Sequence, residues 1–230
     1  MIRINGLSKR YPNRPIFENV SCTFGDGRIH ALVGVNGIGK TTLLTSIAQP
    51  ASMDGGKVEI DGIDAARREA RLRFFYVPDD KGMFLNLTGR EYLGLVSRLY
   101  GQDAGATATA IEGLSASFKL EGSLDEYIAG YSLGMKQKVY LMASLLSGAG
   151  NLILDEPFNG LDPEGAAMLK SLLASHRDAG GLVLFSVHNL DLVANFSDEV
   201  TFIDRRRRVV PMENPKDYAR LERAFFENCA

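Results

Sequence analysis

The stretch from Gly34 to Thr41, GVNGIGKT, constrains the fold more than any other part of this sequence. It fits the pattern G-x-x-x-x-G-K-[ST] and lies between an apolar run at residues 29–35 and a segment, TTLLTSIA, that reads as a helix. Glycines let the backbone curl so that successive N–H groups point at phosphate oxygens, and the helix N-terminus adds a favourable dipole. A glycine turn that merely carries a lysine is the alternative, and the strand-to-helix context argues against it. The stretch therefore predicts a phosphate-binding loop.

The side chains of this loop have distinct expected roles. Lys40 is expected to contact the β- and γ-phosphates of a nucleoside triphosphate, and the Thr41 hydroxyl is expected to ligate Mg²⁺. The residues of this loop that are expected to bind the nucleotide are Asn36, Gly37, Ile38, Gly39, Lys40, Thr41 and Thr42.

Two carboxylates follow a second apolar run. Residues 151–157, NLILDEP, deliver Asp155 and Glu156 where a strand should end. Open α/β sheets place ligand groups at the carboxyl ends of strands, so Asp155 is expected to hold Mg²⁺ and Glu156 to polarise the water that attacks the γ-phosphate. A solvated strand end is the alternative for this pair taken alone, and the phosphate loop favours the catalytic interpretation.

Short apolar runs alternate with longer helical segments along the chain, which predicts an α/β fold with a largely parallel core sheet. The expected core strands are residues 29–35, 151–157 and 181–188, and a helix from about Pro163 to Arg177 separates the last two. Residues from about 87 to 148 show no clear strand and predict an inserted helical subdomain with three helices.

The rest of the chain is expected to flank this core within a single domain, residues 1–230. Residues 1–7, 18–24 and 57–62 predict an antiparallel β flank. Residues 199–204 and 208–212 predict a hairpin, and an amphipathic helix is expected from about 212 to 230.

Composition excludes several other classes of protein. The formal net charge of -2 gives no reason to expect general nucleic-acid or membrane-surface binding, and Arg205 to Arg208 form the only basic run. Cys22 and Cys229 lie far apart without metal-ligand spacing, so neither a disulfide framework nor a zinc site is indicated. The sequence shows neither a signal peptide nor an apolar run long enough to span a membrane, so a soluble, cytoplasmic chain is expected.

Residues 131–138, YSLGMKQK, indicate which class of nucleotide-binding protein this sequence resembles. They should begin a helix, and they precede LILDEP by the separation expected for the signature motif of ATP-binding cassette (ABC) proteins. The chain resembles that family from Tyr11 to about Val210. Of the usual motif L-S-G-G-Q, Ser132 and Gly134 are retained, whereas Leu133 and Met135 depart from the common form. This S-L-G-M version is similar to that of cassettes serving ABC-2 type exporters.

The resemblance implies a P-loop NTPase fold: a RecA-like core with a mainly parallel sheet, an antiparallel β flank and an inserted α-helical subdomain. It also implies ATP hydrolysis with Mg²⁺ by a head-to-tail dimer, in which Ser132, Leu133, Gly134 and Met135 of one subunit reach the nucleotide of the other. Asp162, in the loop NGLD at residues 159–162, would communicate across that dimer.

Two further positions match the family by their place in the chain. His188, after the run LVLFSV, matches the switch histidine that contacts the γ-phosphate, and it would act with Lys40 and Glu156 in catalysis. Tyr11 matches the aromatic residue that stacks on adenine. Taken alone, each would more often be a local hydrogen-bonding or packing residue. His30 and His176 have no such placement and are expected to be structural.

Asp79 marks a departure from the family pattern. The family carries a glutamine in the loop before the helical insertion, and aligning residues 75–93 with that segment puts Asp79 at its position. The resemblance then implies that Asp79 approaches Mg²⁺, directly or through water, and that Asp80 is a solvated loop residue. An ionised carboxylate only accepts hydrogen bonds, whereas an amide also donates them.

The expected function is that of the ATP-binding and hydrolysing subunit of an ABC transporter, an exporter by its signature subtype. Its expected partners are a separate transmembrane permease, through which it sits on the inner face of the cell membrane, and a second cassette in a homodimer or heterodimer. No nucleic acid is expected. The alternative is a soluble cassette protein acting on ribosomes or nucleic acid, favoured only by Arg205 to Arg208. An exposed hairpin tip is the preferred explanation of that basic run. A non-hydrolysing regulatory cassette conflicts with the presence of all four residues Lys40, Asp155, Glu156 and His188.

Overall fold

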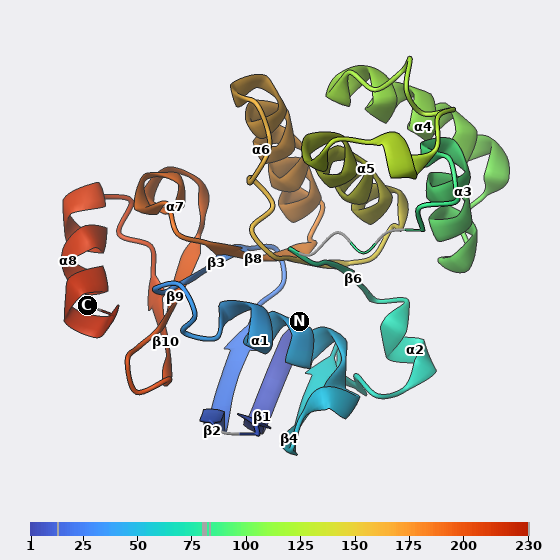
Figure 1. Ribbon diagram of the computed structural model, residues 1–230. Coiled ribbons are helices and arrows are strands. Elements are labelled where there is room, and N and C mark those ends of the chain that lie inside the picture. The colour runs from blue at the N-terminus through green and yellow to red at the C-terminus, as the bar shows by residue number, and fades with distance from the viewer. Residues whose placement is uncertain (13, 80–81, 83, 230) are drawn as a thin grey trace. The chain divides into compact units, whose positions relative to one another are not determined.

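A computed structural model describes residues 1–12, 14–79, 82 and 84–229 (Figure 1). The chain forms two compact units. The first comprises Met1–Pro78, Gly150–Glu156 and Leu173–Ala230, and the second comprises Asp79–Ala149 and Pro157–Leu172. The helical insertion expected at about 87–148 lies within the second unit, which also takes in residues 157–172. Within the described ranges, no helix is long and apolar enough to cross a membrane.

A six-stranded sheet with the strand order β10-β9-β3-β8-β7-β6 forms the core of the first unit. Its strands are β3 (Ile29–Val33), β6 (Phe74–Val77), β7 (Asn151–Leu154), β8 (Leu182–Val187), β9 (Glu199–Ile203) and β10 (Val209–Glu213). Five of them run parallel, and β10 pairs antiparallel with β9 as the expected hairpin. Every residue of β3, β7 and β8 is buried. This burial on both faces explains why their sequences are nearly continuous apolar runs. The expected parallel core is confirmed.

A second, antiparallel sheet with the order β2-β1-β4-β5 forms the expected flank. Its strands are β1 (Ile2–Tyr11), β2 (Arg14–Phe24), β4 (Gly55–Ile60) and β5 (Ile63–Asp64). Helix α1 (Lys40–Ala48) lies between the two sheets, where Leu43 and Ile47 join one apolar cluster with Phe17 of the flank and Leu184 of the core sheet (Figure 1). This cluster holds α1, and with it the glycine-rich loop, against both sheets.

The remaining helices of the first unit are short or terminal: α2 (Arg68–Arg71), α7 (Leu190–Phe196) and α8 (Tyr218–Cys229), with a 3-10 turn at Pro50–Ser52. The first two are too brief for a periodic pattern and were not expected. Helix α8 begins later than residue 212, because residues 209–213 pair with β9 and Asn214 is held apart from the helix. The Asn214 side-chain amide donates to the carbonyl oxygens of Val193 and Ser197 at 2.8 and 2.7 Å.

The second unit contains the three expected helices, α3 (Gly89–Leu99), α4 (Ala104–Phe118) and α5 (Leu133–Leu146), and a 3-10 turn at Ile128–Gly130. Polar residues begin each helix: Thr88 and Glu91 form a reciprocal capping box on α3, Asp103 caps α4, and Ser132 caps α5. Helix α6 (Pro163–Asp178) starts in the second unit and ends in the first.

Candidate functional site

The parallel pairing of β3, β8 and β7 decides where the candidate site lies. Strand β3 pairs with β8, and β8 pairs with β7, all in the same direction. The carboxyl ends of these strands therefore meet at one edge of the sheet, which is where open α/β sheets bind ligands. The loop from Gly34 to Gly39 follows β3, Asp155 and Glu156 follow β7, and His188 follows β8.

The glycine-rich loop leads directly into an uncapped helix. Gly39 is the N-cap residue of α1 and, having no side chain, makes no capping hydrogen bond to the first-turn N–H groups. Gly39 has φ 126°, and an added Cβ would lie 3.0 Å from both Ile16 and Phe17, so only glycine fits here. Free N–H groups at a helix N-terminus attract anions. The backbone N–H of Ile38, unlike a free N–H group, already donates to the Val35 carbonyl oxygen at 3.2 Å. The side chain of Ile38 is buried.

Lys40 extends back along this loop. Its Nζ donates to the carbonyl oxygen of Gly34 at 2.9 Å and lies 3.7 Å from Oε1 of Glu156. Both side chains are largely buried, so the ammonium and the carboxylate compensate each other's charge in a poorly solvated place. The loop and the end of β7 are thus joined electrostatically.

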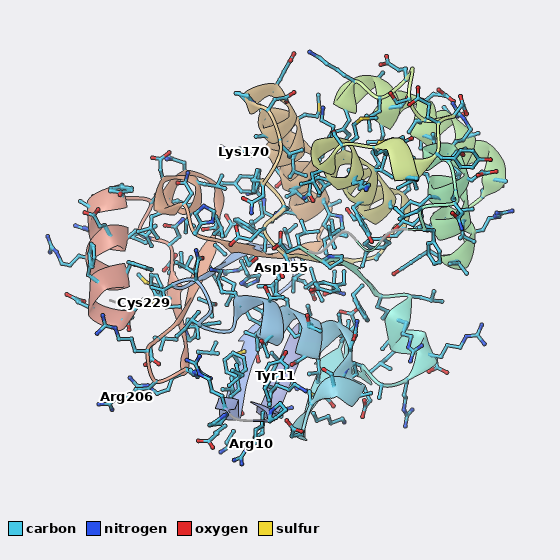
Figure 2. The ribbon with its side chains drawn as sticks, viewed as in Figure 1. Arg10, Tyr11, Asp155, Lys170, Arg206 and Cys229 are labelled. Atoms are coloured by element: carbon cyan, nitrogen blue, oxygen red, sulfur yellow. The ribbon has the colours of Figure 1, made fainter. Side chains whose placement is uncertain are left out.

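Ser186 of β8 connects the two acidic residues. The hydroxyl of Ser186 donates to Oδ1 of Asp155 at 2.5 Å and accepts from the backbone N–H of Glu156 at 2.8 Å. Asp155 is fully buried (Figure 2), and its second oxygen, Oδ2, has no hydrogen-bond partner among the described residues. A buried carboxylate oxygen without a donor is costly. This oxygen is suited to a cation or to the water of a hydrated cation.

Glu156 sits in a backbone conformation that is rare for its type. Its φ is 47°, in the left-handed region, and such strain persists where the surrounding structure holds it and clusters at functional sites. The Oε2 atom of Glu156 lies 3.1 Å from Nδ1 of His188, whose side chain is mostly exposed. One carboxylate therefore contacts a lysine on one side and a histidine on the other, at the edge where a phosphate group is expected.

The remaining expected nucleotide contacts also belong to the first unit. Thr41, Asn36 and Gly37 are exposed, and Thr42 is partly buried. Tyr11 ends β1 with 49% of its surface exposed, and the Nζ of Lys9 lies 5.3 Å from its ring centroid (Figure 2). An exposed aromatic face of this kind can stack on a base.

The signature residues lie in the second unit. The Ser132 hydroxyl accepts from the backbone N–H of Met135 at 3.2 Å, so it starts α5 as a cap. The Leu133 side chain is 75% exposed, which is unusual for leucine. Gly134 lies against the loop after β7: an added Cβ would come within 2.8 Å of the Gly160 carbonyl oxygen. A larger residue at this position would push the two segments apart.

Asp162 has a local structural role in addition to its expected one. Its Oδ1 accepts from the backbone N–H of Gly165 at 2.7 Å, and its Oδ2 lies 3.8 Å from Nζ of Lys138 on α5. It therefore stabilises the start of α6 and links that helix to α5 within the second unit.

Asp79 is exposed and follows β6 as the first residue of the second unit. Asp80, which the sequence predicts to be a solvated loop residue, lies outside the described residues. Of the other histidines, His30 bonds the Gly25 carbonyl oxygen at 2.9 Å and lies 3.2 Å from Glu199, and burial lowers its pKa. Burial also lowers the pKa of His176, whose ring contacts the Gly150 carbonyl oxygen. Both contacts fit the expected structural roles.

Sequence reasoning missed Ser186. Its neighbours LVLF and VH identified a buried strand ending in a histidine, but a serine within an apolar run reads as a minor interruption. A polar residue at a position buried on both faces needs a partner, and this requirement is the signal that could have found it.

Comparisons with known proteins agree on one family. The family described as "ABC transporter" matches residues 17–159. The ABC-type transporter ATP-binding protein EcsA of Bacillus subtilis (strain 168) is 31% identical over 86% of this chain and 81% of its own length. The lantibiotic transport ATP-binding protein SrtF of Streptococcus pyogenes is 28% identical over 93% and 91%, respectively. A solved structure of an ATP-binding subunit of an ABC transporter superposes with a TM-score of 0.90 and 26% identity, covering 98% of this chain and 99% of that one.

The Ser186 bridge yields a prediction. In Ser186→Ala the Asp155 carboxylate and the Glu156 N–H both lose their partner, and changes to groups that orient a metal ligand typically weaken metal binding by about 10- to 100-fold. Mn²⁺ affinity in the presence of ADP, measured by electron paramagnetic resonance, should fall within that range. Ser46→Ala is the matched control, because its buried hydroxyl donates only to the Thr42 carbonyl oxygen. Equal losses in both variants would contradict a positioning role for Ser186.

Proposed function

Because this chain belongs to the ABC transporter family, we propose that it powers an exporter, binding and hydrolysing ATP while a separate membrane-spanning permease carries the substrate. ATP binding and ATPase activity are those of the family. Export is proposed because the signature reads S-L-G-M and because SrtF is named for lantibiotic transport. The observation that best supports ATP hydrolysis is the contact of Glu156 with both Lys40 and His188, at the edge of the sheet where the phosphates are expected to bind.

The proposed mechanism assigns one task to each side chain at this edge. The N–H groups that begin α1 bind the phosphates, and Lys40 turns from the Gly34 carbonyl oxygen to the β- and γ-phosphates when ATP enters. Glu156 accepts a hydrogen bond from the attacking water and polarises it, while His188 contacts the γ-phosphate. The Mg²⁺ ion that accompanies ATP would be held by the Thr41 hydroxyl and by Asp155, and it would neutralise developing phosphate charge.

Tyr11 completes the proposed nucleotide site. Its exposed ring would stack on adenine, with the Lys9 ammonium adding positive charge beside the ring. Stacking of this kind tolerates any base, so selection of adenine would depend on other contacts.

We further propose that hydrolysis requires a dimer of two such cassettes. The proposed signature residues belong to a different unit from the phosphate loop, and Leu133 exposes an apolar side chain beside Ser132. A partner's nucleotide and its surrounding protein would cover this surface. Ser132 and Gly134 would present a hydroxyl and a backbone N–H to the γ-phosphate, and Leu133, Met135 and Asp162 would contact the partner subunit.

Glu156→Gln tests both the catalytic role and the dimer. The amide cannot act as a carboxylate base, so ATP turnover should fall by at least about 100-fold while ATP binding persists. The bound ATP should then hold a stable dimer, visible by size-exclusion chromatography with light scattering. Adding Ser132→Arg should abolish that dimer and leave monomeric ATP binding intact. Undiminished turnover in Glu156→Gln would refute the catalytic assignment, and an unchanged dimer in the double variant would refute the signature contact.

Asp79 is proposed as the residue that senses Mg²⁺ and the attacking water from the loop after β6. It is exposed, so it can approach an incoming Mg²⁺–ATP complex if the loop moves inward. Aspartate is shorter than glutamine by one methylene and cannot donate when ionised. Its contribution would therefore be attraction to the ion rather than donation to the γ-phosphate.

The neighbouring acid supplies a control for this proposal. We expect Asp79→Ala to lower ATP turnover, or transport per ATP hydrolysed, by about 10-fold or more, because an ion ligand is lost. Asp80→Ala should change either quantity less than about two-fold, because the sequence predicts no contact with the ion for this residue. Steady-state ATPase and vesicle transport assays measure the two quantities. Equal effects would place the sensing residue elsewhere.

An apolar surface of the second unit is the proposed docking site for the permease. Phe84 and Tyr127 are each 64% exposed, and Leu85 is 47% exposed. Their segments are paired, because the N–H groups of Ile128 and Ala129 donate to the carbonyl oxygens of Leu87 and Leu85 at 2.9 and 3.2 Å. Exposed apolar patches mark interaction sites. This one follows the Asp79 loop directly in the chain, which would couple permease movement to the nucleotide site.

Copurification tests the partner and the docking surface together. Affinity-tagged protein from detergent-solubilised cells should bring down a multispanning membrane protein. A Phe84→Asp, Tyr127→Asp double variant should lose it, while Leu99→Asp, at a 66% exposed position on α3, should retain it. Recovery of ribosomes or nucleic acid instead would favour a soluble cassette protein.

A further inference from the structure

A pocket of about 490 Å³ lies in the first unit between β2 and the turn that joins β9 to β10. The turn contributes Arg205, Arg206, Arg207 and Arg208, and β2 contributes Pro15, Ile16 and Glu18 among others. Figure 2 shows Arg206 at the outer end of this turn. The volume lies within the range of small-ligand sites. The arginine run was expected at the tip of a hairpin, and the β9–β10 pairing confirms that location.

The positive charge of this pocket is only partly compensated. Asp204 accepts from Nε of Arg208 at 2.7 Å, and the Glu18 carboxylate lies 4.0 Å from the guanidinium of Arg10. Among the described residues, no hydrogen bond or ion pair engages the side chains of Arg205 and Arg206, which are exposed. At least two guanidinium groups, those of Arg205 and Arg206, therefore line the pocket without an ion-pair partner among the described residues, and Glu18 is the acidic residue that shares the lining.

Arg207 is held over the pocket at a cost in backbone energy. Its φ is 61°, in the left-handed region that hairpin turns of this kind usually fill with glycine. The N–H of Arg207 donates to the Asp204 carbonyl oxygen, and its guanidinium donates to the carbonyl oxygen of Pro15 on β2. Burial and the nearby Arg14 guanidinium lower the pKa of Arg207. Strain of this type at a charged residue points to a function.

The pocket is adjacent to the phosphate loop but has its own lining. Ile16 lines the pocket and also lies 3.0 Å from the position of a Cβ added at Gly39. The Ile203 carbonyl oxygen, which ends β9, lies 3.2 Å from a Cβ added at Gly34. None of the loop residues Gly34 to Thr41 lines the pocket. A ligand there would be distinct from ATP while touching a wall that supports the loop.

We propose that this pocket binds a phosphate-bearing anion, either a free polyphosphate compound or the headgroup of an acidic lipid, in addition to the nucleotide. Guanidinium groups form paired hydrogen bonds with phosphate oxygens, and several arginines together match a multiply charged group. An extended nucleic-acid strand would need a longer basic track than this single turn, and the net charge of the chain is -2. The proposal does not depend on the direction of transport.

The experiment keeps the nucleotide site occupied while it probes the pocket. Protein saturated with a fluorescent ADP analogue, without divalent cation, is titrated calorimetrically with inorganic tripolyphosphate. We expect one tripolyphosphate per chain with no release of the analogue. A parallel arm measures sedimentation with phosphatidylglycerol vesicles and, for comparison, phosphatidylcholine vesicles. Binding of tripolyphosphate identifies a soluble ligand, and selective binding of phosphatidylglycerol vesicles identifies a lipid headgroup.

Matched variants connect any binding to the pocket. Arg205→Ala with Arg206→Ala removes two exposed charges from the turn and should weaken anion binding by about 10-fold or more. Arg68→Ala with Arg71→Ala removes two exposed charges from α2 and should change it less than about two-fold. Arg207→Gly keeps the turn conformation, because glycine adopts this φ readily, and should also weaken binding.

Four results would overturn the proposal. Release of the ADP analogue by tripolyphosphate would assign the anion to the nucleotide site. Equal losses in the turn and α2 variants would show a general charge effect. Binding of neither tripolyphosphate nor phosphatidylglycerol vesicles would leave the pocket without an anion ligand. Arginine-dependent binding of a single-stranded RNA oligonucleotide, with no response to either probe, would indicate a nucleic-acid surface.

Discussion

The parallel pairing of β3, β8 and β7 is the constraint on which the rest of the site depends. Parallel strands end at the same edge of a sheet, so the glycine-rich loop, the two acidic residues and His188 meet although more than 150 positions separate the first from the last. The strands are buried on both faces, which makes their register strongly specified. A shift of β7 by one residue would turn Asp155 away from Ser186 and bring an apolar side chain in its place.

Charge compensation at this edge is local and incomplete. Lys40 Nζ and Glu156 Oε1 lie 3.7 Å apart in a largely buried place, and the Ser186 hydroxyl donates to the Asp155 carboxylate and accepts from the Glu156 backbone N–H. One oxygen of Asp155 remains without a donor among the described residues. That oxygen is suited to a cation or to the water of a hydrated cation. Binding of a phosphate group would also compete with Glu156 for the Lys40 ammonium.

The division of the chain into two units separates two kinds of task. The first unit carries the glycine-rich loop, the acidic pair, His188 and Tyr11, which are the groups proposed to bind and act on a nucleotide. The second carries Ser132, Gly134, Asp162 and Asp79, whose proposed tasks concern a partner subunit or the arriving ion. Within the second unit, Gly134 approaches Gly160 closely, so the signature segment and the loop after β7 share one contact. Communication between dimer contacts and the acidic pair would pass through this loop, which is continuous with Glu156.

The glycine-rich loop, the acidic pair and the buried core strands could be predicted from the sequence, because each is contiguous and carries its own periodicity or spacing. The roles assigned to the site residues stay predictions. Thr88, Asp103 and Ser132 could likewise be read as helix starts from short local patterns. Three features could be seen only once the chain was folded: Ser186 bridges Asp155 and Glu156, Glu156 takes a left-handed backbone conformation, and the arginine turn borders a pocket against β2. These features depend on contacts between segments distant in the chain. A local sequence pattern does not specify which distant residue will form a hydrogen bond or an ion pair with a given side chain.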